Sequence, residues 1–99
     1  MTEMTAFLKP LGEKDPEFAQ RVLEVMGLAN ADGALDAKTK TLMSLLADAI
    51  LAHGDGVAAI AARARQEGVS EQAIAETVRM AFITGGLPAL VTALRAFRP

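Results

Sequence analysis

The chain has 99 residues, a formal net charge of −2, no cysteine, and a hydrophobic share of 52% against 22% charged residues. The length suits one domain, the charge argues against nucleic-acid binding, and the missing thiols exclude disulfides, thiol redox chemistry and cysteine–zinc sites. The apolar surplus predicts surface that partner subunits cover.

No targeting or membrane segment is expected. The start "MTEMTAFLKP" has no basic region followed by an apolar run, so it does not resemble a secretory signal. The most apolar run, Leu42 to Ala52, is too short to cross a bilayer and contains Asp48. These features predict a cytoplasmic protein without a membrane partner.

The first half of the chain reads as an N-terminal arm followed by two helices. Residues 1–14 are expected to form the arm. Asp15 is expected to cap a helix that has Pro16 at its first position and apolar residues at helical spacing up to Ala29. After the turn-rich stretch "NADGALD", Asp36 is expected to cap a second helix over residues 37–53, which Gly54 ends.

The second half reads as three further helices. One is expected to start at Asp55 or Gly56 and to run to Gly68. Ser70 is expected to cap the next, over residues 71–84, and two glycines, Gly85 and Gly86, to end it. Its predicted inward-facing residues are Ile74, Val78, Ala81 and Phe82. Pro88 is expected to start a short fifth helix. The predicted fold is all-α, with one domain over residues 1–99 and short loops.

The break "LAHGDGVAAI", residues 51–60, holds the only histidine of the chain. A histidine ionises near neutral pH, which suits general acid–base chemistry, but His53 also suits the end of a helix, near the last carbonyls. Asp55 fits an N-cap of the next helix or an acid–base partner of His53. One histidine and one aspartate are too few ligands for a zinc site, and "GDG" lacks the lysine and spacing of a phosphate loop. No metal or cofactor is therefore expected.

Four pieces carry a resemblance to a known family. They are "LDAKTK" before an apolar helix, the break with a small-residue helix ending in "ARQEGVS", then "EQAIAETV", and finally "GGLPAL". In this order and spacing, Gly33 to Leu94 resemble the carboxymuconolactone decarboxylase family, which includes the alkylhydroperoxidase D proteins. The resemblance implies a small all-α fold that assembles into trimers or hexamers.

The peroxidase branch of that family carries Cys-x-x-Cys, a histidine one turn further on, and an upstream glutamate as proton relay. A cysteine at a helix N-terminus is made acidic, and a second one resolves its oxidised form. The resemblance places these positions on His53, Gly56 and Ile60, with the glutamate near Thr41. A thiol peroxidase mechanism is therefore excluded. In the decarboxylase branch, His53 and Asp55 match a polar break, while Ile60 replaces a histidine and cannot transfer a proton.

Three hypotheses follow. The preferred one is a non-redox homo-oligomer of this family that lacks the family's catalytic residues and that either binds a small ligand or is a structural or regulatory relative. Arg63, Arg65 and Arg79 could line a pocket for an anionic ligand, although solvated faces or ion pairs between subunits explain them better. The second is an active decarboxylase-type or lactone-processing enzyme with His53 and Asp55 as acid and base. The third is an interaction module for a separate enzyme, so the sequence leaves enzymatic activity open.

Overall fold

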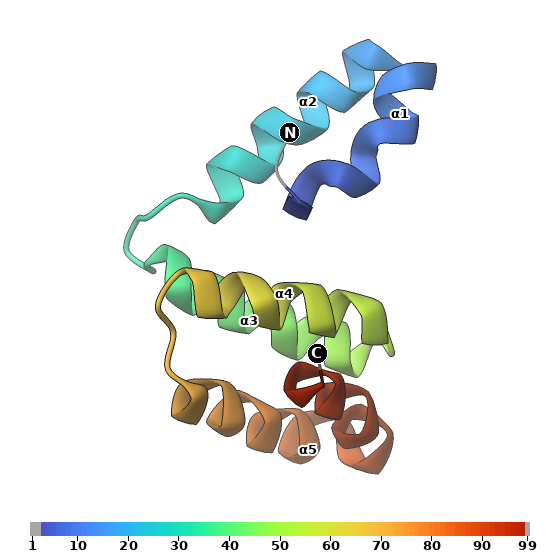
Figure 1. Cartoon of the computed structure of the whole chain (residues 1–99). Helices are drawn as coiled ribbons and strands as arrows, with labels where there is room; N and C mark the ends of the chain where they lie inside the picture. Colours follow the sequence, from blue (N-terminus) through green and yellow to red (C-terminus); the bar gives the residue numbers. More distant parts are fainter. Residues whose placement is uncertain (1–2, 99) are drawn as a thin grey trace. The chain divides into compact units, whose positions relative to one another are not determined.

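Two helical units make up the chain, and the computed structural model describes residues 3–98 of it (Figure 1). The units cover Met1–Ala37 and Lys38–Pro99. Within the described range every element is a helix and there is no strand, which confirms the all-α prediction. The elements are the 3-10 helix η1 (Glu3–Leu8), α1 (Lys9–Lys14), α2 (Pro16–Asn30), α3 (Ala37–Ile50), α4 (Gly54–Gln66), α5 (Glu71–Ala93) and the 3-10 helix η2 (Leu94–Phe97).

The N-terminal unit is a helical hairpin of α1 and α2. The described part of the segment expected as an arm, residues 3–14, forms η1 and α1. Asp15 lies between the two helices and caps α2 as predicted, because its Oδ1 accepts a hydrogen bond of 3.1 Å from the Phe18 amide. Among side chains whose burial is described, only Leu8 and Ala19 of this unit are buried. The hairpin therefore has almost no core of its own.

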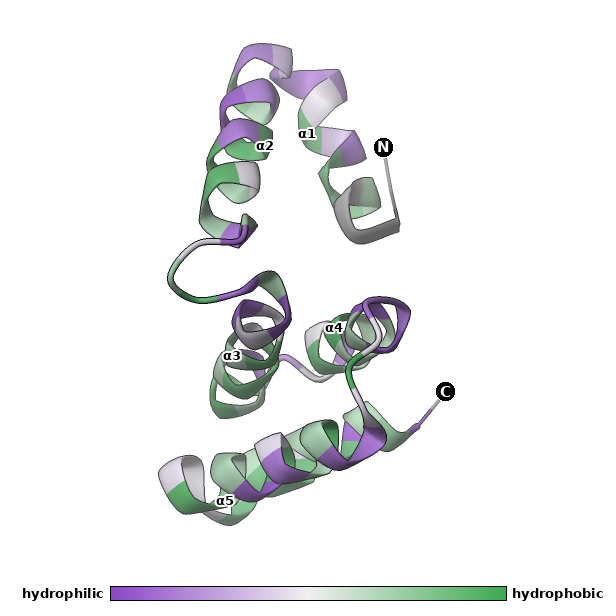
Figure 2. Ribbon diagram, turned by 90° about the vertical axis from the view of Figure 1, so that its left-hand side faces the viewer, coloured by the Kyte–Doolittle hydropathy of each residue, from purple (hydrophilic) through white to green (hydrophobic). Residues whose placement is uncertain are grey.

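The C-terminal unit places α3 and α4 side by side, with α5 across them (Figures 1 and 2). Its core is built from small residues, since seven of its eleven buried members are alanine. Alanine favours the helix and lets two backbones approach closely. The core members are Leu45, Ala49, Val57, Ala61, Ala64, Ile74, Val78, Ala81, Ala89, Ala93 and Ala96.

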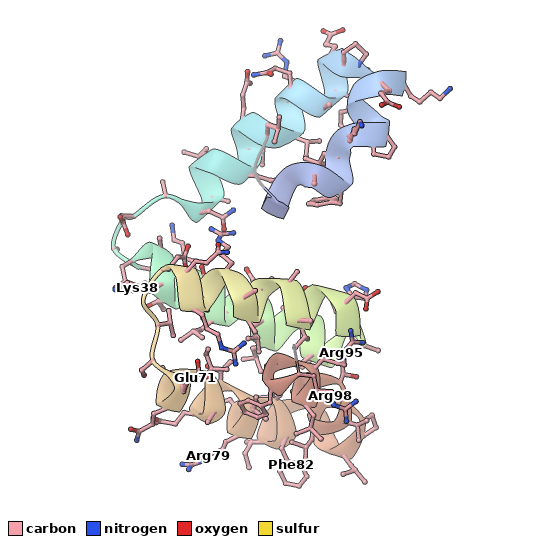
Figure 3. All side chains as sticks on the ribbon, viewed as in Figure 1. Lys38, Glu71, Arg79, Phe82, Arg95 and Arg98 are labelled. Carbon is pink, nitrogen blue, oxygen red and sulfur yellow. The ribbon has the colours of Figure 1, made fainter. Side chains whose placement is uncertain are left out.

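The predicted inward face of α5 is correct at three positions and wrong at one. Ile74, Val78 and Ala81 are buried, whereas Phe82 is 47% exposed. Figure 3 shows the Phe82 ring extending from α5 away from α3 and α4. The neighbouring Ala81 faces the core and is fully buried, so the ring at the next position points to the side of the helix.

Helix α5 is interrupted where two glycines were expected to end it. Gly86 has φ 77° and ψ −168°, which breaks the helical backbone, and Pro88 lies in the first turn beyond the break. The fifth helix expected from Pro88 is thus the second half of α5. A Cβ on Gly85 would collide with Ala89 and press on Ile50 of α3, so close packing requires a glycine there. The helical stretch Glu71–Phe97 meets the length and hydropathy of a membrane span, and 22% of its most apolar window is buried.

Arg65 joins three segments of the C-terminal unit. Its Nε donates to Glu71 Oε2 at 2.8 Å and its Nη2 to Glu71 Oε1 at 2.9 Å, which links the last turn of α4 to the first turn of α5. Nη2 also donates to the Ala96 carbonyl in η2 at 2.8 Å. The Arg65 hydrogen bonds hold the pKa of Glu71 below its usual value, and the same bonds raise the pKa of Arg65.

Glu71→Gln is expected to remove a pH-dependent part of the stability. Because the pKa of Glu71 is lower in the folded state, its ion pair stabilises the protein above the ordinary glutamate value of about 4.3, and this contribution disappears as pH falls through the folded pKa. The wild type should be more stable than Glu71→Gln at pH 7, with a difference that closes in acid, as measured by urea unfolding. Glu76→Gln, at an exposed position of α5, is the control; an equally pH-dependent loss there would contradict the assignment to Arg65.

Candidate functional site

The turn between α3 and α4 is closed by a left-handed residue. Ala52 has φ 63°, the one non-glycine positive φ in the described residues. Its amide bonds the Ala49 carbonyl at 3.2 Å, and the His53 amide bonds the Asp48 carbonyl at 2.8 Å. This pair of bonds is a Schellman motif. Helix α3 therefore ends before Ala52, and the expectation that Gly54 ends it is wrong, because Gly54 already begins α4.

The turn brings His53 against Asp48, a pairing that the sequence did not predict. His53 Nδ1 lies 3.3 Å from Asp48 Oδ1, and the two side chains are 61% and 24% exposed. Five positions separate the residues along the chain, so they share no helical face; they meet because the turn folds the chain back over the last turn of α3. With Nδ1 facing the carboxylate, Nε2 is the ring nitrogen available to a ligand.

Gly56 makes room for the Asp48 carboxylate. A Cβ built on Gly56 would collide with Asp48 Oδ2, so the carboxylate lies directly against the first turn of α4. An acidic group is stabilised there by the positive end of the helix. His53 is the N-cap residue of α4 and gives it no side-chain hydrogen bond. The carboxylate thus contacts both the imidazole and the start of α4.

Asp55 does not share the hydrogen-bond partner of His53. Its Oδ1 accepts a hydrogen bond of 3.0 Å from Arg95 Nη2, and its side chain is 98% exposed. Figure 3 shows Arg95 near this end of α4. Asp55 lies in the first turn of α4, so the expectation that it is the N-cap is wrong: α4 starts earlier than predicted, and His53 takes that position. The catalytic roles expected for His53 and Asp55 stay a prediction. The two residues do not pair with each other: His53 pairs with Asp48, and Asp55 pairs with Arg95.

The two other positions that the resemblance singled out lie inside the unit. Thr41 is 2% exposed and donates a hydrogen bond of 2.7 Å to Glu67 Oε1. Glu67 also accepts a bond of 3.1 Å from Arg63 Nε, so its carboxylate is held between α3 and α4. Ile60 is partly buried and packs against the core. Neither position carries a group that titrates.

The three arginines considered for an anionic ligand do not converge. Arg63 pairs with Glu67 and Arg65 with Glu71, while Figure 3 shows Arg79 extending from α5 away from α4. A shallow groove of about 190 Å³ lies between α3 and α5 and has no charged side chain in its lining. Its lining residues are Thr39, Leu42, Met43, Leu46, Thr77 and Met80. Residues 3–98 contain no group of three or more histidine or acidic side chains that could hold a metal ion.

The fold and this turn define a small, thiol-free, all-helical protein. The sequence profile of the carboxymuconolactone decarboxylase family matches residues 16–99, and the chain therefore belongs to this family. The comparison with curated proteins gave no match, and neither did the comparison with solved structures. Family membership covers α2 to α5 and agrees with the resemblance seen in the sequence.

Ala52→Gly is expected to stabilise the protein by about 1 kcal/mol, since a glycine adopts the left-handed conformation without the cost that a Cβ imposes. Ala59→Gly, at an exposed interior position of α4, is the matched control and should destabilise by a similar amount. Chemical unfolding followed by circular dichroism measures both. A loss of stability in Ala52→Gly would show that the turn is held by something other than its backbone conformation.

Proposed function

We propose that this chain is a non-redox homo-oligomer of the carboxymuconolactone decarboxylase family that has lost the catalytic residues of the family's peroxidase branch. The observation that carries the proposal is an uncharged stretch of α5, residues 80–93, much of which its own unit leaves exposed. The absence of cysteine supports the non-redox part of the proposal, because the peroxidase chemistry of the family requires thiolates. A trimer or hexamer in the cytoplasm is the form we propose.

Large apolar side chains gather on the outer side of α5 and at the end of α3. Ile83 is 72% exposed, Leu87 63% and Val91 61%. Leu87 and Val91 lie one helical turn apart beyond the break at Gly86, and Ile83 lies before the break. Ile50 and Leu51 are exposed too, and Ile50 lies next to Gly85 at the break of α5. We call these five side chains the apolar face. A monomer would hold them in water, whereas a subunit interface would bury them.

A protein partner suits the apolar face better than lipid does. The backbone of α5 is non-helical at Gly86, and a departure from regular helix is costly in hydrocarbon, where no water can satisfy backbone groups. The helix also carries Glu76 and Arg79 before the break, both exposed. At a subunit interface, side chains and water can satisfy such groups. Within this proposal a small ligand would be uncharged, since the α3–α5 groove offers apolar side chains and threonines.

Ile83→Asp is expected to dissociate the oligomer, because each subunit would have to bury an unpaired carboxylate. Size-exclusion chromatography with light scattering at micromolar concentration should give a trimer or hexamer for the wild type and a smaller species for the variant. Gln72→Asp places the same charge at an exposed position in the first turn of α5 and should leave the assembly unchanged. A monodisperse wild-type monomer would refute the proposal.

The purified protein is expected to consume no alkyl hydroperoxide above the buffer rate when a dithiol reductant is supplied. The reason is that no thiolate is present to be oxidised and regenerated. Peroxide loss measured over time checks this, with a cysteine-containing peroxidase as the positive control. Robust turnover that survives removal of contaminating metals would contradict the non-redox assignment.

A further inference from the structure

We propose that Asp48 and His53 form a carboxylate–imidazole dyad, in which Asp48 holds the proton on Nδ1 and His53 Nε2 is a nucleophile toward small activated acyl esters. This activity goes beyond the proposed function, which depends on the apolar face and on the missing thiols. It also differs from the pairing of His53 with Asp55 that the sequence favoured. The dyad lies within one unit, so its contacts are all internal to that unit.

One unusual backbone conformation and one missing side chain flank His53, and both serve its contact with Asp48. Ala52, directly before it, is held in the left-handed region, and this conformation turns the chain so that His53 meets the end of α3. Gly56, three residues after it, has no Cβ where the Asp48 carboxylate lies. The left-handed backbone of Ala52 is a conformation of the kind found where a side chain must be held in place.

The dyad fixes which ring nitrogen carries the proton. A carboxylate at 3.3 Å from Nδ1 accepts its N–H, so the neutral ring keeps its lone pair on Nε2. Within residues 3–98 no hydrogen-bond partner is found for Nε2, and the side chain is 61% exposed. The nearby opposite charges, Asp55 and Arg95, are paired with each other. An accessible lone pair with a fixed tautomer is what nucleophilic attack requires.

The acyl transfer balances with water as the second reactant. The Nε2 lone pair attacks the ester carbonyl carbon and forms a C–N bond, and the alkoxide or phenolate leaves with the electron pair of the broken C–O bond. Asp48 stabilises the positive charge that develops on the ring, whose Nδ1 proton is then lost to solvent. Water hydrolyses the acyl-imidazole, which releases the carboxylic acid and restores His53. Because His53 is exposed rather than enclosed, the substrate class is limited to esters with good leaving groups.

The tautomer is read directly by nitrogen NMR, because the chain has a single histidine. In the wild type above neutral pH we expect the Nδ1–H form, and in Asp48→Ala the Nε2–H form that unconstrained histidine prefers. Gly56→Ala should give the same change, since the new Cβ displaces the carboxylate while alanine improves the helix. The Gly56 variant therefore tests the dyad without relying on a destabilised protein.

The reactivity is measured with p-nitrophenyl acetate and the full chain. His53→Ala should reduce the rate to background, and Asp48→Ala should reduce it about tenfold, well below the roughly 10⁴-fold effect of the aspartate in an enclosed triad. The Gly56→Ala and Asp48→Ala effects should not add in the double variant, because both remove the same interaction. Glu76→Ala is the control for removal of an exposed carboxylate and should react at the wild-type rate.

Three outcomes would overturn the proposal. The first is an Nε2–H tautomer in the wild type, and the second is a wild-type rate in Asp48→Ala. The third is a change of tautomer in Asp55→Ala instead, which would restore the pairing that the sequence favoured. None of these outcomes bears on oligomerisation or on peroxide turnover, so the failure of the dyad and the failure of the proposed function are distinguishable.

Discussion

The close approach of helices through alanine is the constraint on which the C-terminal unit depends. With seven alanines among eleven core residues, α3, α4 and α5 come together over small side chains, and a core of this kind buries little apolar area per residue. Larger apolar groups such as Phe82, Ile83 and Leu87 are then left on the outside of α5. The same choice of residues that lets the unit pack so tightly also leaves the apolar face exposed. In the proposed oligomer this would couple the stability of a subunit to its assembly.

The helices were predictable where a side chain marks their start. Asp15 and Ser70 each accept a hydrogen bond from the amide three residues on, which is the interaction that their residue types predict. The end of α3 was not predictable in the same way. The sequence offers Gly54 as the left-handed residue, but Ala52 takes that conformation because the Schellman bonds to Asp48 and Ala49 outweigh the cost of its Cβ.

The position of the candidate site could be predicted from the sequence, but the pairing of its side chains could not. The resemblance placed the break around His53 at the position of the family's catalytic residues. The family match covers residues 16–99 and so includes this break. The partner of His53 was not visible, since Asp48 belongs to the preceding helix at a spacing that no helical face explains. Only the direction of the chain after Ala52 brings the two together. Asp55, adjacent in sequence, is instead held by Arg95, forty residues away.

One hydrogen bond of Arg65 ties together two distant parts of the chain. Arg65 and the Ala96 carbonyl are 31 residues apart, so their hydrogen bond closes a long loop, whereas the bonds within α4 and α5 join near neighbours. Closing a long loop costs entropy before the interaction is made. The docking of η2 on α4 carries this cost and the bonds inside each helix do not. The Arg65 side chain thus offsets part of the chain entropy that is lost when the C-terminal end of the unit is brought back onto α4.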